Sequence, residues 1–190
     1  HLELIAKIDG EVRSFDPGEA PTYQAAILAG AARGLSPREA KRGFNQVTWL
    51  EGVDRLFLPG TGVSTGNGWI KYGLVANDVG YFGTYTSGGY AARDFSDPLG
   101  DLAVLEAALD DALAQFALVG VRAVIVDASM NHGGHDFISR AIAARFAQTS
   151  LFAYAKFARD ASDPYRTDVY LTPAEGVQFT GQVYFLTSDI

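Results

Sequence analysis

Two segments of the chain place apolar residues at helical spacing. In the first segment, the apolar positions at steps of three and four residues are Leu102, Leu105, Leu109, Leu113 and Phe116. Asp97 and Pro98 precede this segment and Gly120 follows it, and these are residue types that begin and end helices. The second segment runs from Phe137 to Phe146. The spacing predicts an amphipathic helix in both places.

Strand patterns surround these two helices. Apart from Arg122, residues 121–126 form an apolar, mostly β-branched run, as expected of a strand buried on both faces. Residues 69–75 and 79–85 flank a short polar turn and predict a hairpin. Further strands are predicted at residues 11–15, 151–157, 168–171 and 182–186. Alternating helices and strands indicate an α/β fold.

The first 43 residues of the chain carry mostly helical patterns. Leu2 to Ile8 carries apolar residues on one helical side and predicts the end of a helix. Thr22 to Ala32 predicts a second helix, and Ser36 with Pro37 predicts the start of a third. We therefore expect a helical and strand segment at 1–43 and an α/β domain at 44–190, a division that one compact domain could also accommodate.

Composition narrows the classes of function. The chain has 190 residues, of which 48% are apolar and 19% charged, so a sizeable core is expected. The net charge is −7 without clustered Lys or Arg, which argues against nucleic-acid and anionic-membrane partners. The absence of cysteine removes disulfides, thiolate zinc sites and a cysteine nucleophile. No apolar run is long enough to span a membrane, and no motif indicates a cofactor.

The candidate chemistry lies between the buried strand and the second helix. The strand ends at Asp127, and Gly133 and Gly134 then precede the helix. Glycine lets the backbone turn sharply, and free N–H groups at a helix start favour an anion or a developing oxyanion. A plain strand-to-helix connection would require the same flexible residues, so the pattern alone leaves both interpretations open.

This stretch, from Val124 to Gly134, resembles the Ile-Asp-Leu-Arg-x-Asn-Gly-Gly-Gly signature of the C-terminal-processing (tail-specific, tricorn-core-like) serine peptidases. The resemblance extends as an ordered series over residues 70–190. It includes the preceding helix rich in Ala and acidic residues, and the late strand Gly181 to Ser188. It implies a crotonase/ClpP-like α/β core, incomplete at both ends, that hydrolyses peptide bonds by acyl transfer.

The resemblance also implies roles for individual residues. Gly133 and Gly134 would supply an oxyanion-hole N–H, while Asn131 and His132 would lie along the substrate and Asn131 would brace the turn. Asp127 would be a structural acid. The nucleophilic serine would follow beyond Ile190, the substrate would be a peptide or protein, and the location would be extracytoplasmic in a bacterium. Neither a metal nor a cofactor is implied, and the oligomeric state stays open.

Three positions depart from the family pattern. Glu11 stands where a related branch has its candidate base, a histidine, and a partly buried carboxylate can also act as a base. Ser129 stands in place of the signature arginine and His132 in place of the first glycine. A non-catalytic module that binds a ligand or peptide, similar to the retinoid-binding relatives, is therefore the alternative function.

Other chemistry at the same turn is also compatible with the sequence. His132 and His135 could form a metal pair with Asp127 or Asp136, although loop histidines lack the fixed geometry of a helical pair. His132 could itself be a base. Ser129 lacks the flanking glycines of a nucleophile elbow, and residues 60–68 are glycine-rich without the ending of a phosphate loop.

Overall fold

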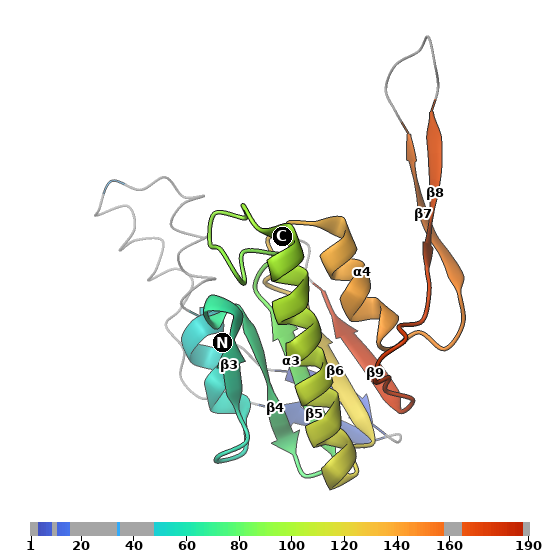
Figure 1. Ribbon diagram of the computed structural model, residues 1–190. Helices are drawn as coiled ribbons and strands as arrows, with labels where there is room; N and C mark the ends of the chain where they lie inside the picture. The colour runs from blue at the N-terminus through green and yellow to red at the C-terminus, as the bar shows by residue number, and fades with distance from the viewer. Residues whose placement is uncertain (1–3, 9–10, 16–33, 35–47, 158–164, 188–190) are drawn as a thin grey trace.

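The structure is a computed structural model that describes residues 4–8, 11–15, 34, 48–157 and 165–187. A mixed five-stranded sheet is its centre, with a long helix across one face and a hairpin that projects away from the sheet (Figure 1). The prediction of an α/β architecture is confirmed at this level. The boundary expected near residue 43 lies outside the described residues and stays a prediction.

The central sheet combines an antiparallel and a parallel half. Its strands, in spatial order, are β3 (Val63–Thr65), β4 (Ile70–Ala76), β5 (Val79–Thr84), β6 (Ala123–Asp127) and β9 (Gln182–Leu186). The hairpin β4–β5 is antiparallel, whereas β5, β6 and β9 run parallel. Gly83, Asp127 and Leu186 are paired across these three strands, so their carboxyl ends meet at one edge of the sheet.

Both predicted helices form, with ends that the sequence explains. Helix α3 (Pro98–Val119) begins after Asp97, whose carboxylate accepts the N–H of Gly100 at 2.9 Å, and ends at Gly120 with φ 72°. A left-handed conformation at this position favours glycine. Helix α4 (Asp136–Ala144) starts directly after the Gly133–Gly134 turn. Helix α3 therefore connects β5 to β6. Helix α4 follows β6 and begins at the carboxyl edge of the sheet.

The middle strands of the sheet are buried on both faces. On one face, the side chains under α3 and α4 include Tyr72, Phe82, Leu105, Phe116, Val124, Val126 and Ile138. On the other face, the alternate strand residues Val79, Tyr81, Ala123 and Ile125 pack with Trp49, Val53 and Leu56. These last residues belong to the short helices η1 (Thr48–Gly52) and η2 (Val53–Leu56). Burial on both faces is why residues 123–126 are continuously apolar.

A two-stranded hairpin stands apart from the central sheet. Its strands are β7 (Leu151–Phe157) and β8 (Arg166–Leu171), which pair antiparallel with a bulge between Phe152 and Tyr154. It extends beyond α4 as an arm (Figure 1). The predicted strands here and at residues 182–186 are confirmed. None of the helices in the described part of the chain has both the length and the apolar character that a membrane span needs.

The helix expected at Leu2 to Ile8 is wrong. Leu4–Ile8 is strand β1, which pairs antiparallel with β2 (Glu11–Phe15) in register Ile8 to Glu11. A seven-residue apolar pattern is too short to separate the two periods, and Asp-Gly between two runs favours a two-residue hairpin connection. The helices expected over 22–32 and from Ser36 lie outside the described residues.

Three tyrosines of the core should resist titration while the protein is folded. Burial raises the pKa of Tyr72, Tyr81 and Tyr90, with a further contribution from Asp111 to Tyr72 and from Asp127 to Tyr81. Because the unfolded chain releases these protons near pH 10 and the folded chain keeps them, the contribution of these three tyrosines to stability should not change below about pH 10, and stability should fall above it.

This expectation can be checked by absorbance at 295 nm along an alkaline titration of the nine tyrosines. The buried three should ionise only in the cooperative step in which circular dichroism reports unfolding. Ionisation of all nine near pH 10 in a still-folded protein would contradict their burial.

Candidate functional site: a glycine turn at the carboxyl edge of the sheet

The glycine turn lies where the parallel strands end. After β6, the N–H of Ala128 donates to the carbonyl of Leu186 at 2.9 Å, which ties the start of the turn to the end of β9. On the other side, a parallel bridge joins Gly134 to Ser87, three residues after β5 ends. The turn therefore spans the carboxyl ends of all three parallel strands, an edge at which ligands bind in many α/β folds.

The bridge fixes how Gly134 is oriented. Ser87 donates its N–H to the carbonyl of Gly133 at 2.8 Å, and its own carbonyl accepts the N–H of His135 at 2.6 Å. In such a parallel bridge the residues on either side of Gly134 make the bonds, so its own N–H and carbonyl point away from Ser87. The N–H of Gly134 has no acceptor among the described residues, and the residue is exposed. A ligand can thus reach a fixed, unused donor.

Asn131 holds the turn in this conformation. Its side-chain oxygen accepts the N–H of Gly133 at 2.8 Å and lies 3.3 Å from the hydroxyl of Ser87. Its amide nitrogen donates to the hydroxyl of Thr84 at 3.1 Å, which links the turn to the end of β5. The N–H of Gly133 is consequently engaged inside the protein, and Gly134 carries the available donor.

The two glycines differ in how much room surrounds them. A Cβ on Gly134 would lie 2.3 Å from the carbonyl oxygen of Ser87, so the bridge excludes any side chain there. A Cβ on Gly133 would meet no atom within 4 Å. Both residues have positive φ, 86° for Gly133 and 142° for Gly134. Glycine at 134 is therefore required by close packing as well as by backbone conformation.

Asp127 anchors the strand end beneath the turn. Its carboxylate accepts the hydroxyl of Tyr81 at 2.6 Å and the N–H of Ser129 at 2.8 Å, and the side chain is buried. The bond to Ser129 bends the chain immediately after β6. Because a buried carboxylate must be paired, this arrangement gives Asp127 a structural task.

The remaining site residues expected from the sequence are not all brought together. His132 lies in the turn, and its ring meets that of Tyr85 edge-on, with 4.8 Å between the ring centres. Glu11 lies in β2, in a small sheet separate from the one that carries the turn, so its part in the chemistry stays a prediction. Among the described residues, no three His, Cys, Asp or Glu side chains gather as a metal site would require.

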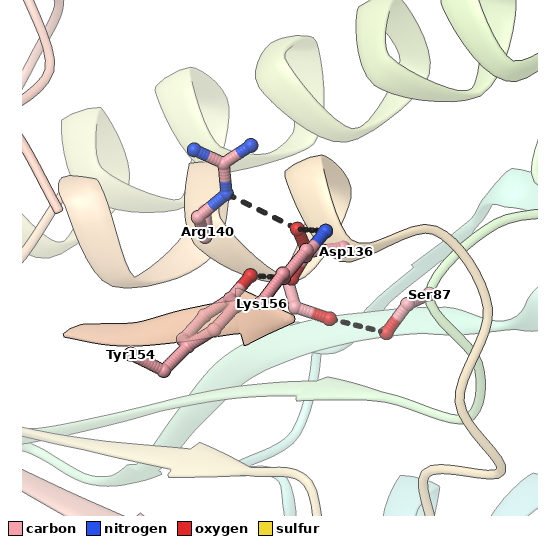
Figure 2. Close-up of polar contacts among 6 residues, drawn as sticks. Ser87, Asp136, Arg140, Tyr154 and Lys156 are labelled. Carbon is pink, nitrogen blue, oxygen red and sulfur yellow. Dashed lines mark hydrogen bonds and ion pairs between the residues drawn. The ribbon is translucent and has the colours of Figure 1, made fainter. Parts of the chain in front are cut away.

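A charged cluster fastens the projecting hairpin to α4 next to the turn. Asp136, the first residue of α4, accepts hydrogen bonds from Tyr154 and, at 2.8 Å, from Lys156, both on β7 (Figure 2). Arg140, one helical turn along, lies 3.7 Å from the same carboxylate. Hydrogen bonds from Lys156 and Tyr154 lower the pKa of Asp136. The hydrogen bond to Asp136 raises the pKa of Lys156. Strand β7 is thus held to Asp136, two residues after Gly134.

This fastening should loosen at acidic pH or when Asp136 is replaced. Because the pKa of Asp136 is lowered on folding, the contact is present above the usual aspartate range and is lost as pH falls below it. Asp136→Asn should speed hydrogen exchange in β7 and β8 several-fold at neutral pH. The global melting temperature should hardly change, since the pair is exposed.

Asp168→Asn is the matched control for that experiment. Asp168 pairs with Arg166 at 2.6 Å within the same hairpin, and neither belongs to the Asp136 cluster. Equal acceleration of exchange by both variants would show that Asp136 does not fasten the hairpin.

Ser87 and Ser139 belong to the site but were missed as site residues. The hydroxyl of buried Ser87 lies 2.7 Å from that of Ser139 on α4. The backbone of Ser87 supplies the bridge to Gly134. The sequence marks Ser87-Gly88-Gly89 only as the opening of a loop. A small residue followed by two glycines directly after a strand is the signal that points to a close backbone approach.

Comparisons with known proteins bear on the fold. No protein-family model matches the sequence, and no curated protein matches it. A crystal structure of a "putative peptidase" from Parabacteroides merdae is similar, with a TM-score of 0.52 and 21% sequence identity. The alignment covers 76% of this chain and 39% of the other, so the chain spans well under half of that structure's length. The likeness shows a fold shared with that peptidase-like protein.

Proposed function

We propose that this chain forms part of a serine-type peptidase of the C-terminal-processing kind, with a crotonase/ClpP-like core, in which Gly134 donates the oxyanion-hole hydrogen bond. The observation that carries the proposal is the exposed N–H of Gly134, fixed by the Ser87 bridge and without an acceptor among the described residues. Rigid donors aimed at developing charge are typically the largest single contribution to catalysis of acyl transfer.

The position of β9 supports a nucleophile on the segment that follows it. β9 runs parallel to β6 and ends beside Asp127, at the edge where the turn begins. A chain that continues from β9 therefore leaves the sheet at the same edge as the glycine turn. The sequence resemblance puts the nucleophilic serine in that segment, beyond Ile190. Its own N–H would then be the second donor that the turn lacks, because Asn131 engages Gly133.

The charges near the turn favour an anionic transition state. Gly134 directly precedes α4, whose N-terminal end carries partial positive charge. The one acidic side chain in the first turn, Asp136, is offset by two cations, Lys156 and Arg140. Asp136, Lys156 and Arg140 together carry a positive charge, which stabilises an oxyanion at the start of α4.

The proposed reaction is acyl transfer in two steps. The serine oxygen attacks the peptide carbonyl carbon, the oxyanion forms against Gly134, and the C–N bond then breaks as the amine takes a proton. Water next cleaves the acyl ester and regenerates the hydroxyl. A base must take the serine proton, and the sequence-based candidates are Glu11, from the resemblance, and His132, from its place in the turn. Comparing the pH profiles of Glu11→Gln and His132→Gln would distinguish them.

The second candidate function is a binding module that uses the same turn without cleavage. It is favoured by Glu11, Ser129 and His132, which depart from the resembled pattern. The N–H of Gly134 and the start of α4 would then hold a carboxylate or a peptide carbonyl. Both candidates require Gly134, so the experiment must separate binding from bond cleavage.

The test uses the full-length protein that contains this chain. A fluorophosphonate should form a bond between phosphorus and one serine oxygen with loss of fluoride, and mass spectrometry should place the adduct after Ile190. Cleavage of a peptide library should disappear when that serine becomes alanine. If peptides bind but no serine is labelled and none is cleaved, the peptidase proposal is wrong and the binding module is supported.

A further inference from the structure

A loop beside the glycine turn holds an aromatic side chain in a strained backbone conformation. Phe95 has φ 63°, which for a bulky residue costs about 1–3 kcal/mol. Two local contacts maintain it: the N–H of Phe95 donates to the carbonyl of Ala92 at 3.0 Å, and Asp94 accepts the N–H and the hydroxyl of Ser96. The surrounding residues 91–97 form an exposed loop on the way to α3.

The ring of Phe95 covers a floor of two glycines. A Cβ on Gly88 would lie 2.9 Å from the ring, and a Cβ on Gly89 would lie 3.4 Å from it. Trp69 and His135 stand on two sides, each with its ring centre 6.2 Å from that of Phe95. Because neither glycine has a side chain, Phe95 fills a space that the rest of the protein leaves free for an aromatic ring.

His135 is incompletely satisfied while Phe95 occupies this space. Its Nε2 atom is buried and has no hydrogen-bond partner among the described residues, and the adjacent Cδ2 faces Gly88. Buried polar atoms are nearly always paired, and leaving one unpaired costs about 1–3 kcal/mol. The phenyl ring of Phe95 cannot accept a strong hydrogen bond. The strained backbone of Phe95 therefore favours release of its ring, whereas the Nε2 atom of His135 stays unpaired against any phenyl ring.

This space lies next to the proposed oxyanion donor. Gly88 follows Ser87, whose backbone bridges Gly134. An extended peptide advances about 3.3 Å per residue with alternating side chains. A substrate carbonyl at Gly134 would therefore present a neighbouring side chain within reach of the floor at Gly88 and Gly89.

We propose that Phe95 occupies, in the ligand-free protein, a subsite for an aromatic side chain of the peptide substrate. Binding displaces Phe95, loop 91–97 moves outward, and the incoming ring packs between Trp69 and His135 on the two glycines. The subsite rests on the proposed function for its position, but it binds its side chain without any covalent step. The protein then selects peptides that carry an aromatic residue next to the bond held at Gly134.

The experiment measures binding of N-acetyl-L-phenylalanine methylamide to the full-length protein and to Phe95→Ala. Removing Phe95 abolishes the need for displacement, so the affinity should rise about tenfold or more. N-acetyl-L-alanine methylamide should gain nothing. Leu99→Ala, an exposed residue on the first turn of α3, is the matched control and should leave both affinities unchanged. An unchanged affinity in folded Phe95→Ala overturns the subsite.

A second measurement serves if Phe95→Ala does not fold. In the wild-type protein, saturation with the phenylalanine amide should accelerate hydrogen exchange at Phe95 and its neighbours in 91–97, because the bond to Ala92 opens. Unchanged exchange there, with the probe bound, contradicts displacement. Binding of the probe without any peptide cleavage upholds the subsite and rejects the peptidase. If peptides are cleaved without preference for aromatic residues, equally by wild type and Phe95→Ala, the peptidase is upheld and the subsite is rejected.

Discussion

Gly134→Ala is expected to lower peptidase activity of the full-length protein by about a hundredfold to a thousandfold, the loss that follows removal of one oxyanion donor. The new Cβ would lie 2.3 Å from the carbonyl oxygen of Ser87. That overlap is between backbone-fixed atoms, so it separates the turn from Ser87 and moves the N–H. Loss of the two bridge hydrogen bonds, together with backbone strain, should also lower stability by about 2–4 kcal/mol.

Gly133→Ala is the matched control for this result. Its Cβ has no neighbour within 4 Å, so only the positive φ of 86° is unfavourable, at about 1–2 kcal/mol. The N–H of Gly134 should keep its place and most activity should survive. Steady-state kinetics with one peptide substrate, at a temperature where both variants are folded, compares them. Equal activity of Gly134→Ala and the wild type would remove Gly134 from the mechanism.

Asp127→Ala is expected to destabilise the protein by about 2–4 kcal/mol in urea unfolding. The substitution leaves the hydroxyl of Tyr81 buried without its acceptor and frees the N–H of Ser129. Asp127→Asn keeps an acceptor of the same shape and should cost about 1 kcal/mol, which separates lost pairing from lost charge. Tyr81 and Asp127 are both buried, so solvent cannot replace the bond between them.

A double variant tests whether this pair acts as a unit. Tyr81→Phe removes only the hydroxyl, and its effect combined with Asp127→Ala should be less than the sum, by about 0.5–3 kcal/mol. Strict additivity would contradict the direct bond. Because Asp127 bends the chain after β6, activity should fall further than stability alone explains if the bend positions Gly134.

The sequence predicts the central elements of the fold well. The long helix has a complete set of signals, from the cap at Asp97 to Gly120, and the structure begins and ends α3 within a residue of them. The hairpin β4–β5 and the doubly buried strand β6 also follow from local patterns. Leu4–Ile8 does not, because its strand conformation depends on pairing with β2 rather than on its own spacing.

The candidate site is only partly predictable, for a related reason. Asn131, Gly133 and Gly134 are recognisable because they lie within four residues of the chain and their residue types are typical of a turn. Ser87 lies more than forty residues earlier and reaches Gly134 through backbone atoms, so the sequence around Ser87 can indicate a close approach but not its partner. The same holds for Phe95, whose position over Gly88 depends on a three-dimensional contact between separate loops.

The most direct test of the central claim is a crystal structure of the full-length protein after reaction with a peptidyl phosphonate. The account predicts an adduct on a serine that follows β9, with a phosphoryl oxygen about 2.7–3.1 Å from the nitrogen of Gly134. An adduct whose oxygen is bound elsewhere, with the N–H of Gly134 still facing solvent, would contradict the assignment of this turn as the oxyanion hole.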